Sequence, residues 1–323
     1  MNNKKILLSG IKPSGKLHIG NYFGAMKQFV DLQDEYNTKI FIANYHALTT
    51  LKDPVELNKN TFDIAIDYLA IGLKPEKMTL FTQSDVPEVT ELAWIFSTIT
   101  SMPYLMRAHA FKDAEAKNKE INVGVFDYPL LMAADILLHN ADVVPIGSDQ
   151  KQHVEIARDI AGKFNRLYGD TFKLPEPIIL DEVKIVPGID GRKMSKSYGN
   201  TIPLFGSDEE IKKAVMSIVT DSKSPEDKKD PEGDNIFALH KLFSVEQLPD
   251  LEKRYREGGI GYKESKDLLA ENIISFVTPM RQRRDDLLND KEKIMKILKN
   301  GGEIVRSDAK DKMIEIRKKV GLL

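Results

Sequence analysis

The sequence predicts an α/β fold in which a doubly wound parallel sheet is followed by a C-terminal helical domain. Strand and helix patterns alternate three times within residues 5–83, and this alternation is typical of a parallel sheet with helices on both faces. From Asp208 onward only helical patterns occur. A chain of 323 residues also exceeds the ~150 residues usual for one domain, so two domains are expected, divided near residue 200.

The first half of the expected sheet follows directly from short apolar runs. Residues 5–11 suit a buried parallel strand, and a helical pattern follows over about 20–36. A second strand is expected over 39–48, a second helix over 55–73 and a third strand over 78–83. The order of these elements indicates a Rossmann-like sheet.

The second half is less regular. Helices are expected over 88–100, 102–112, 128–140 and 150–169, with a strand over 142–147. Beyond residue 200 the helical patterns include 263–289 and 302–320, and the polar stretch 220–234 separates such segments. Trp94 lies in an apolar helical segment and is expected in the core.

Composition excludes several kinds of site. The chain has no cysteine, so it has no disulfide, thiolate nucleophile, sulfur-ligated zinc or iron–sulfur cluster, and its histidines show no metal-ligand spacing. The net charge of −2 argues against a general nucleic-acid coating. No apolar stretch approaches the ~20 residues of a membrane span, and the N-terminus is typical of a first strand, so a cytoplasmic protein without membrane contact is expected.

The loop after the first strand offers two interpretations. Residues 10–16, GIKPSGK, fit the start of the phosphate loop of kinases and NTPases, but Leu17 stands where that loop needs a hydroxyl and Pro13 removes one backbone N–H. One step later, His18, Gly20 and Asn21 lie at a helix entry, where free N–H groups favour an anion. A simple capping segment has the same appearance.

A second loop carries two lysines between glycines. In GRKMSKSYGN, residues 191–200, Lys193 and Lys196 lie three positions apart in a segment too polar for a core. A solvated surface turn is one interpretation, and a mobile clamp for an anion is the other.

The two loops together resemble the paired ATP motifs, HIGH and KMSKS, of class I aminoacyl-tRNA synthetases. The second motif is matched letter for letter over 193–197. With SGIKPSG, NYHALT and residues 126–159, the chain looks like a tryptophanyl-tRNA synthetase of the compact bacterial type. It departs from the usual pattern at Leu8, Lys12, Asn21 and 108–112.

The resemblance implies a function and a domain plan. It implies a Rossmann-like catalytic domain over 1–200, and a helical domain over 201–323 on the anticodon side of tRNA, with the last helix packing back on the catalytic domain. The expected reaction joins L-tryptophan and ATP, with Mg²⁺ on the phosphates, into tryptophanyl-adenylate and pyrophosphate, and then charges the 3′ end of tRNA(Trp). A homodimer is also implied, and Arg281–Arg284 is a candidate tRNA surface. A tyrosyl-tRNA synthetase and a phosphate-loop kinase stay as alternatives, as does a non-catalytic nucleic-acid module.

The resemblance also carries residue roles. No protein nucleophile is needed, so positive charge and hydrogen-bond donors around the transferring phosphate must do the work. The implied catalytic residues are His18, Asn21, Lys193 and Lys196. The implied ATP contacts are Lys12, Pro13, Ser14, Gly20, Asn21, Gly147, Ser148, Asp149, Ile185, Lys193, Met194, Ser195, Lys196 and Ser197. An ordinary helix cap at Ser148 or Asp149 is compatible with that role.

Tryptophan selection gives an independent pattern. Tyr128, Met132 and Asp135 stand at i, i+4 and i+7, so a helix presents them on one face. Plain helix core explains the first two equally well, but it leaves the Asp135 charge among aliphatic residues. By resemblance, Asp135 accepts the indole N–H. The implied tryptophan contacts are Leu8, His46, Tyr128, Met132, Asp135, Val144, Ile146 and Gln150; His46, placed on the second strand, suits a core histidine almost as well.

Overall fold

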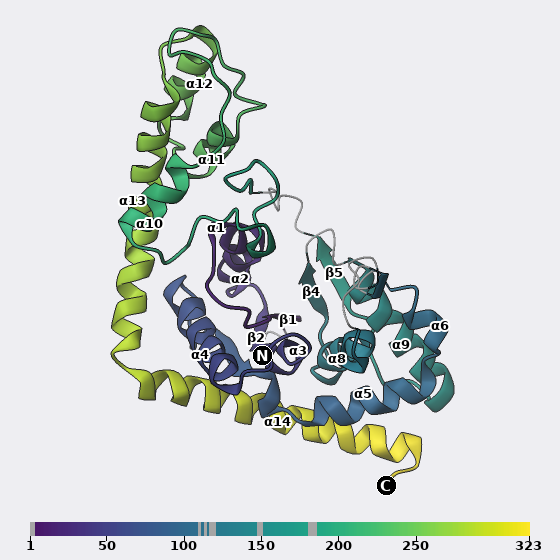
Figure 1. Cartoon of the computed structure of the whole chain (residues 1–323). Helices are drawn as coiled ribbons and strands as arrows, with labels where there is room; N and C mark the ends of the chain where they lie inside the picture. The colour runs from purple at the N-terminus through teal and green to yellow at the C-terminus, as the bar shows by residue number, and fades with distance from the viewer. Residues whose placement is uncertain (1–3, 109–110, 113–114, 116–120, 147–150, 180–185) are drawn as a thin grey trace.

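A five-stranded parallel sheet forms the centre of the protein. The computed structural model describes residues 4–108, 111–112, 115, 121–146, 151–179 and 186–323. The strands run in the order β3-β2-β1-β4-β5, and every pair is parallel, which confirms the doubly wound α/β prediction (Figure 1). They are β1 (Ile6–Ile11), β2 (Asn37–Ile42), β3 (Met78–Thr82), β4 (Val143–Ile146) and β5 (Glu176–Ile179).

Helices surround this sheet and then continue alone. Those between the strands are α1 (Ile19–Asn21), the π-helix η1 (Tyr22–Met26), α2 (Lys27–Leu32), α3 (Asn44–Ala47), α4 (Pro54–Ala70), the 3₁₀ turn η2 (Gln83–Asp85), α5 (Glu88–Ile99), α6 (Met102–Leu105), α8 (Val123–Leu138) and α9 (Lys151–Tyr168). After the turn η4 (Lys196–Tyr198) come α10 (Asp208–Met216), α11 (Asn235–Phe243), α12 (Leu248–Glu257), α13 (Tyr262–Leu288) and α14 (Lys291–Val320). The expected helix-only C-terminal region is thus present.

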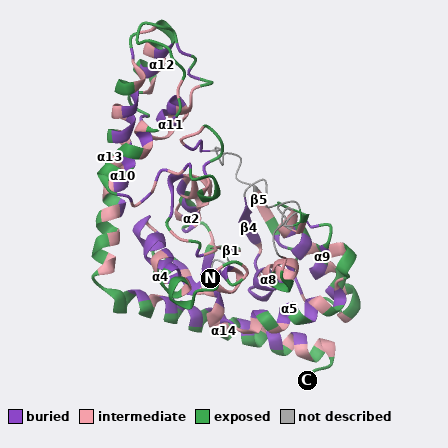
Figure 2. Ribbon diagram, in the orientation of Figure 1, coloured by how far each residue is buried: buried purple, intermediate pink, exposed green. Residues whose placement is uncertain are grey.

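Neighbouring strand residues point to opposite faces of the sheet, and helices cover both faces. Leu7 packs into one apolar cluster with α4, α10 and α13, whereas Leu8 packs into a second with α5, α8 and α9. Leu80 and Phe81 divide between the same two clusters. Figure 2 shows β1 and β4 as buried between these helices.

Two strand predictions need correction. The expected strand 39–48 ends at Ile42, and His46 lies in the short helix α3, where the Gln83 side chain accepts hydrogen bonds from its first backbone N–H groups. The strand β5 was not expected, because Pro175 and Pro177 argue against a strand. An edge strand tolerates proline, and β5 is at the edge of the sheet.

The helix after β1 is not regular. The expected single helix over 20–36 consists of α1, the π-helix η1 and α2, and it ends at Leu32. Tyr22 and Phe23 of η1 pack edge-on or stacked against Phe276 of α13, and Phe23 also meets Phe243 of α11. These aromatic contacts tie the segment after the first loop to the C-terminal helices.

The last helix begins eleven residues earlier than the predicted 302–320, at Lys291. Gly301 and Gly302 lie inside it, although glycine weakens a helix. A Cβ atom at Gly301 would lie 1.9 Å from the Leu80 carbonyl oxygen, and one at Gly302 would lie 2.7 Å from the Asp85 Cβ. The glycines therefore let α14 approach β3 closely, and the buried Lys39 of β2 pairs with Asp308 of α14 at 3.1 Å.

Three arginines of the candidate tRNA surface have partners within the chain. Arg281 donates to Asp208, Arg283 to the Ala70 carbonyl oxygen and Arg284 to Asp67. These contacts fasten α13 to α10 and α4. Figure 1 shows α13 rising from this junction with α11 and α12 near its far end.

Candidate active site

The first loop leads from β1 into α1 and places His18 at the helix entry. His18 has extended backbone angles at the N-cap, and its backbone N–H donates to the Asn21 side-chain oxygen at 3.1 Å. His18 is 6% exposed, and its Nδ1 has no hydrogen-bond partner among the described residues. One buried imidazole nitrogen at this helix entry thus has no partner within the described part of the chain.

The lysine loop lies directly against this helix entry. The Gly20 N–H contacts the Met194 sulfur at 3.3 Å, and the Lys196 ammonium donates to the carbonyl oxygens of Ser14 and Gly15 at 3.1 and 2.9 Å. A Cβ atom on Gly20 would lie 3.1 Å from the Met194 Cβ, so glycine permits this approach. Two motifs some 170 residues apart therefore form one surface.

Burial and the nearby Lys196 charge lower the pKa of His18 to about 4. His18 is therefore neutral near pH 7, and a neutral imidazole can donate a hydrogen bond but carries no charge. Positive charge at this place comes from the lysine loop.

Asn200 organises the lysine loop, and its role was not expected. It is 1% exposed; its side-chain oxygen accepts from the Ser195 N–H at 2.8 Å, and its nitrogen donates to Asp190 and to the Lys193 carbonyl oxygen. A buried asparagine with all these bonds holds the loop in a defined shape. In the sequence, the only indication of this role was that Asn200 ends the lysine-loop segment 191–200.

The structure describes some of the remaining predicted ATP contacts but not all of them. Lys12 donates to the Thr49 hydroxyl at 3.0 Å, and burial lowers the pKa of its ammonium. Pro13 is buried in the first loop, Lys193 is exposed, and Ser197 contacts the Ser195 hydroxyl at 2.9 Å. The other predicted residues lie outside the described part of the chain: Gly147, Ser148, Asp149 and Ile185, together with the tryptophan contact Gln150.

A second site lies beside the carboxyl ends of β1 and β4. A cavity of about 120 Å³ is lined by five of the predicted tryptophan contacts, which come from β1, β4 and α8. They are Leu8, Met132, Asp135, Val144 and Ile146. His153 of α9 lines the same cavity, contacts the Tyr128 hydroxyl at 3.1 Å and was not predicted.

Asp135 is the single carboxylate among the described residues that line this cavity. It is 2% exposed, and burial raises the pKa of its carboxyl, while hydrogen bonds from His46 and Gln83 oppose that shift. The His46 ring nitrogen lies 3.1 Å from one carboxylate oxygen. Packing in a plain helix core therefore does not account for Asp135. The His46 side chain contacts the Asp135 carboxylate.

Two further observations concern the described residues as a whole. In the part of the chain that the structure describes, no cluster of three metal-binding side chains occurs, and no helix combines the length and apolarity of a membrane span. Leu17 is buried and supplies no hydroxyl, so the first loop lacks the Mg²⁺ ligand of a phosphate loop. The site thus offers donors and positive charge, and near them lies a mainly apolar cavity with one carboxylate among its described lining residues.

Comparison with known proteins gives consistent matches. Residues 1–278 match the family described as tRNA synthetases class I (W and Y). The chain is 49% identical to the tryptophan–tRNA ligase of Fusobacterium nucleatum over 98% of both chains, and 48% identical to that of Campylobacter jejuni over 98% and 99%.

Solved structures agree. A crystal structure of Campylobacter jejuni tryptophanyl-tRNA synthetase complexed with ADP and tryptophan has a TM-score of 0.92 at 47% identity, covering 98% of this chain and 99% of that one. An Archaeoglobus fulgidus tyrosyl-tRNA synthetase complexed with L-tyrosine reaches a TM-score of 0.67 at 20% identity over 87% and 90% of the two chains, so it shares the fold.

Proposed function

The chain belongs to the class I tRNA synthetases for tryptophan and tyrosine, and from that premise we propose how its residues activate L-tryptophan and pass it to tRNA(Trp). Its activity is that of a tryptophan–tRNA ligase, for which ATP is the second substrate. The phosphate-loop alternative is thereby set aside. The observation that supports the choice of tryptophan is the buried Asp135 carboxylate in an apolar cavity, because an indole has a single donor and needs one acceptor.

The tryptophan side chain would occupy the cavity between β1, β4 and α8. Leu8, Met132 and Val144 supply apolar walls, and Asp135 accepts the indole N–H. A ligand without that donor leaves the buried carboxylate unpaired, which in comparable sites costs roughly 10⁴-fold or more in specificity.

ATP would lie between the helix entry and the lysine loop. His18 and Asn21 present donors from the start of α1, while Lys193 and Lys196 bring positive charge to the leaving pyrophosphate. Mg²⁺ enters with ATP on its phosphates. No covalent enzyme intermediate is required, since the tryptophan carboxylate attacks the α-phosphorus directly.

Lys196→Ala is expected to lower kcat for tryptophan-dependent ATP–pyrophosphate exchange about 100-fold, as loss of one stabilising donor does, with little change in tryptophan affinity. Lys196 contacts the first loop through Ser14 and Gly15 and lies away from the residues that line the cavity. Steady-state exchange kinetics with direct titration of tryptophan binding would separate the two quantities. A change confined to KM would contradict a clamp that acts in the transition state.

We also propose a homodimer assembled through α5 and the N-terminal end of α8. Trp94, which was expected in the core, is 71% exposed on α5, and Val123 is 79% exposed at the start of α8. Leu48 and Trp94 line one hollow of about 480 Å³, and Asn122 and Gly124, on either side of Val123, line it as well. An exposed apolar patch of this kind is typical of a protein interface.

Trp94→Asp is expected to convert the dimer into a monomer, because the new charge would be buried without a partner. Light scattering after gel filtration measures the mass of both proteins, and in the wild-type protein the emission of Trp94, its single tryptophan, reports whether that side chain is buried. Val245→Asp is a matched control, since Val245 is 67% exposed beyond α11. A monomeric wild-type protein would contradict the dimer.

The helical region 201–323 would face the anticodon side of tRNA(Trp), with residues 1–200 as the catalytic domain. A cytoplasmic location follows from the proposed role in protein synthesis. The function as a whole is tested by ATP–pyrophosphate exchange with each amino acid in turn. Exchange is expected with tryptophan; exchange with tyrosine alone, or with none, would reject the assignment.

A further inference from the structure

We propose that Gln83 is a positioning residue for tryptophan selection, whose side-chain amide holds the Asp135 carboxylate ionised and aimed into the cavity. The inference deepens the proposed function, and it rests on the cavity being the tryptophan site. Neither Gln83 nor η2 attracts attention in the sequence. The proposed role of Gln83 rests on contacts between three segments that are distant along the chain.

The hydrogen bonds of Gln83 determine the orientation of its amide. Its nitrogen donates to both oxygens of Asp135, at 3.0 and 2.8 Å, and its oxygen accepts from the backbone N–H groups of Tyr45 and His46, at 3.0 and 3.3 Å. A carboxylate demands a donor and a backbone N–H demands an acceptor, so a flipped amide would lose every bond. Gln83 is 1% exposed, and water cannot replace these partners.

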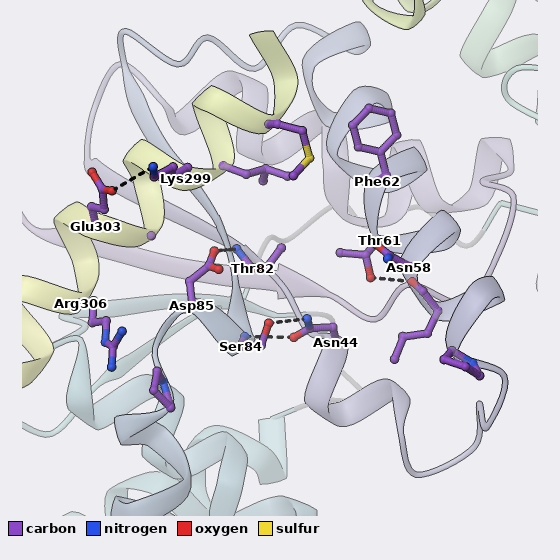
Figure 3. Close-up of a pocket in the computed structure, with 16 residues that line it drawn as sticks. Asn44, Asn58, Thr61, Phe62, Thr82, Ser84, Asp85, Lys299, Glu303 and Arg306 are labelled. Atoms are coloured by element: carbon purple, nitrogen blue, oxygen red, sulfur yellow. Dashed lines mark hydrogen bonds and ion pairs between the residues drawn. The ribbon is translucent and has the colours of Figure 1, made fainter. Parts of the chain in front are cut away.

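The residues beside Gln83 fix its backbone from the other side. The Asn44 side chain donates to the Ser84 hydroxyl at 2.7 Å and accepts from the Ser84 N–H at 3.0 Å. Figure 3 shows this pair in a separate hollow, which has a volume of about 790 Å³. α3 and η2 thus bind each other through Asn44 and Ser84, and both contact Asp135, through His46 and Gln83.

The chemical consequence is a carboxylate that can only accept. Burial raises the pKa of Asp135, and the hydrogen bonds from His46 and Gln83 oppose this. A protonated carboxyl would present an O–H group, which an indole N–H cannot accept. Keeping the charge therefore favours binding of the indole N–H. The titratable groups on the elements around Asp135 include Tyr45 and His46 on α3, Asp85 on η2, Asp127 and Tyr128 on α8, His139 at the C-cap of α8, and Lys151, His153, Glu155, Arg158, Asp159, Lys163, Arg166 and Tyr168 on α9.

Two substitutions at Gln83 are expected to give opposite pH dependences. Gln83→Met removes the donor, so the Asp135 pKa rises further and the carboxyl protonates at lower pH. The KM for tryptophan should then exceed the wild-type value about 10- to 100-fold at pH 6 and return towards it by pH 9, with kcat within a few-fold of wild type.

Gln83→Glu reverses the sign. At pH 6 the introduced carboxyl is protonated, donates to Asp135 and still accepts from the two backbone N–H groups. As the pH rises that proton leaves, and two adjacent carboxylates repel each other. The KM for tryptophan should therefore be near the wild-type value at pH 6 and rise about 10-fold or more by pH 9.

The comparison with wild type removes the contribution of the neighbouring titratable groups, because all variants share them. Ser84→Ala is the matched control: it loosens the same turn without touching Asp135, and its KM should follow the wild-type pH profile. Thermal melts by circular dichroism confirm that each variant is folded. Wild-type exchange without tryptophan dependence would refute the proposed function itself. Tryptophan-dependent wild-type exchange with parallel, pH-independent losses in both Gln83 variants would overturn the positioning role.

Discussion

Asp135→Ala is expected to lower kcat/KM for tryptophan in ATP–pyrophosphate exchange by about 100-fold. The substitution removes the acceptor for the indole N–H, and hydrogen bonds to charged groups contribute up to about 3 kcal/mol. It also leaves the donors of Gln83 and His46 without their partner. Exchange measured with purified protein over a range of tryptophan concentrations gives the ratio directly.

The fold should survive this change. Burial already disfavours the charged form of Asp135, so its removal relieves an electrostatic cost even as it leaves a small space. Asp135→Asn is the matched control, since it keeps the volume and one acceptor oxygen, and an intermediate loss is expected. A melting curve close to wild type must accompany the lost exchange. Unchanged kinetics in the alanine variant would contradict the role of Asp135.

Gly301→Ala should have the largest effect on stability. The added methyl group would lie 1.9 Å from the Leu80 carbonyl oxygen, a backbone atom of β3 that cannot move independently. Either α14 or the strand must shift, at a cost of about 3 kcal/mol or more in the free energy of unfolding. Urea unfolding followed by circular dichroism measures this loss.

The same substitution elsewhere has the opposite expected sign. Gly162 lies within α9, and a Cβ there would meet only the end of the Arg166 side chain, at 3.5 Å. Gly162→Ala should therefore stabilise the protein by about 0.5–1 kcal/mol through helix propensity. Similar effects of the two substitutions would show that the close approach of α14 to β3 is unimportant.

The elements that the sequence predicted well are those whose local pattern agrees with their environment. β1 and β3 are apolar runs buried on both faces, and α9 has a clear apolar side. β5 was missed because Pro175 and Pro177 carry a local signal against a strand, which an edge position overrides. The start of α14 was missed because Gly301 and Gly302 carry a local signal against a helix interior. In the fold these glycines allow close packing against Leu80 and Asp85.

The site shows the same division. The helix spacing of Met132 and Asp135 placed both in one cavity, and the family motifs brought His18 and Lys196 together. Gln83 could not be foreseen, since a glutamine after a strand has no periodicity or spacing of its own. Its function depends on where three separate segments meet, and only the folded chain specifies that.

The position of α14 has a consequence for how the protein is made. Ile294 and Leu298 belong to the cluster on one face of the sheet, and Val305 and Met313 belong to the cluster on the other. Neither apolar cluster is complete until α14 has left the ribosome, although the strands emerge earlier. Until α14 emerges, the nascent polypeptide therefore exposes apolar surface around β3. Chaperone binding during translation should be greatest between the emergence of β3 and that of α14.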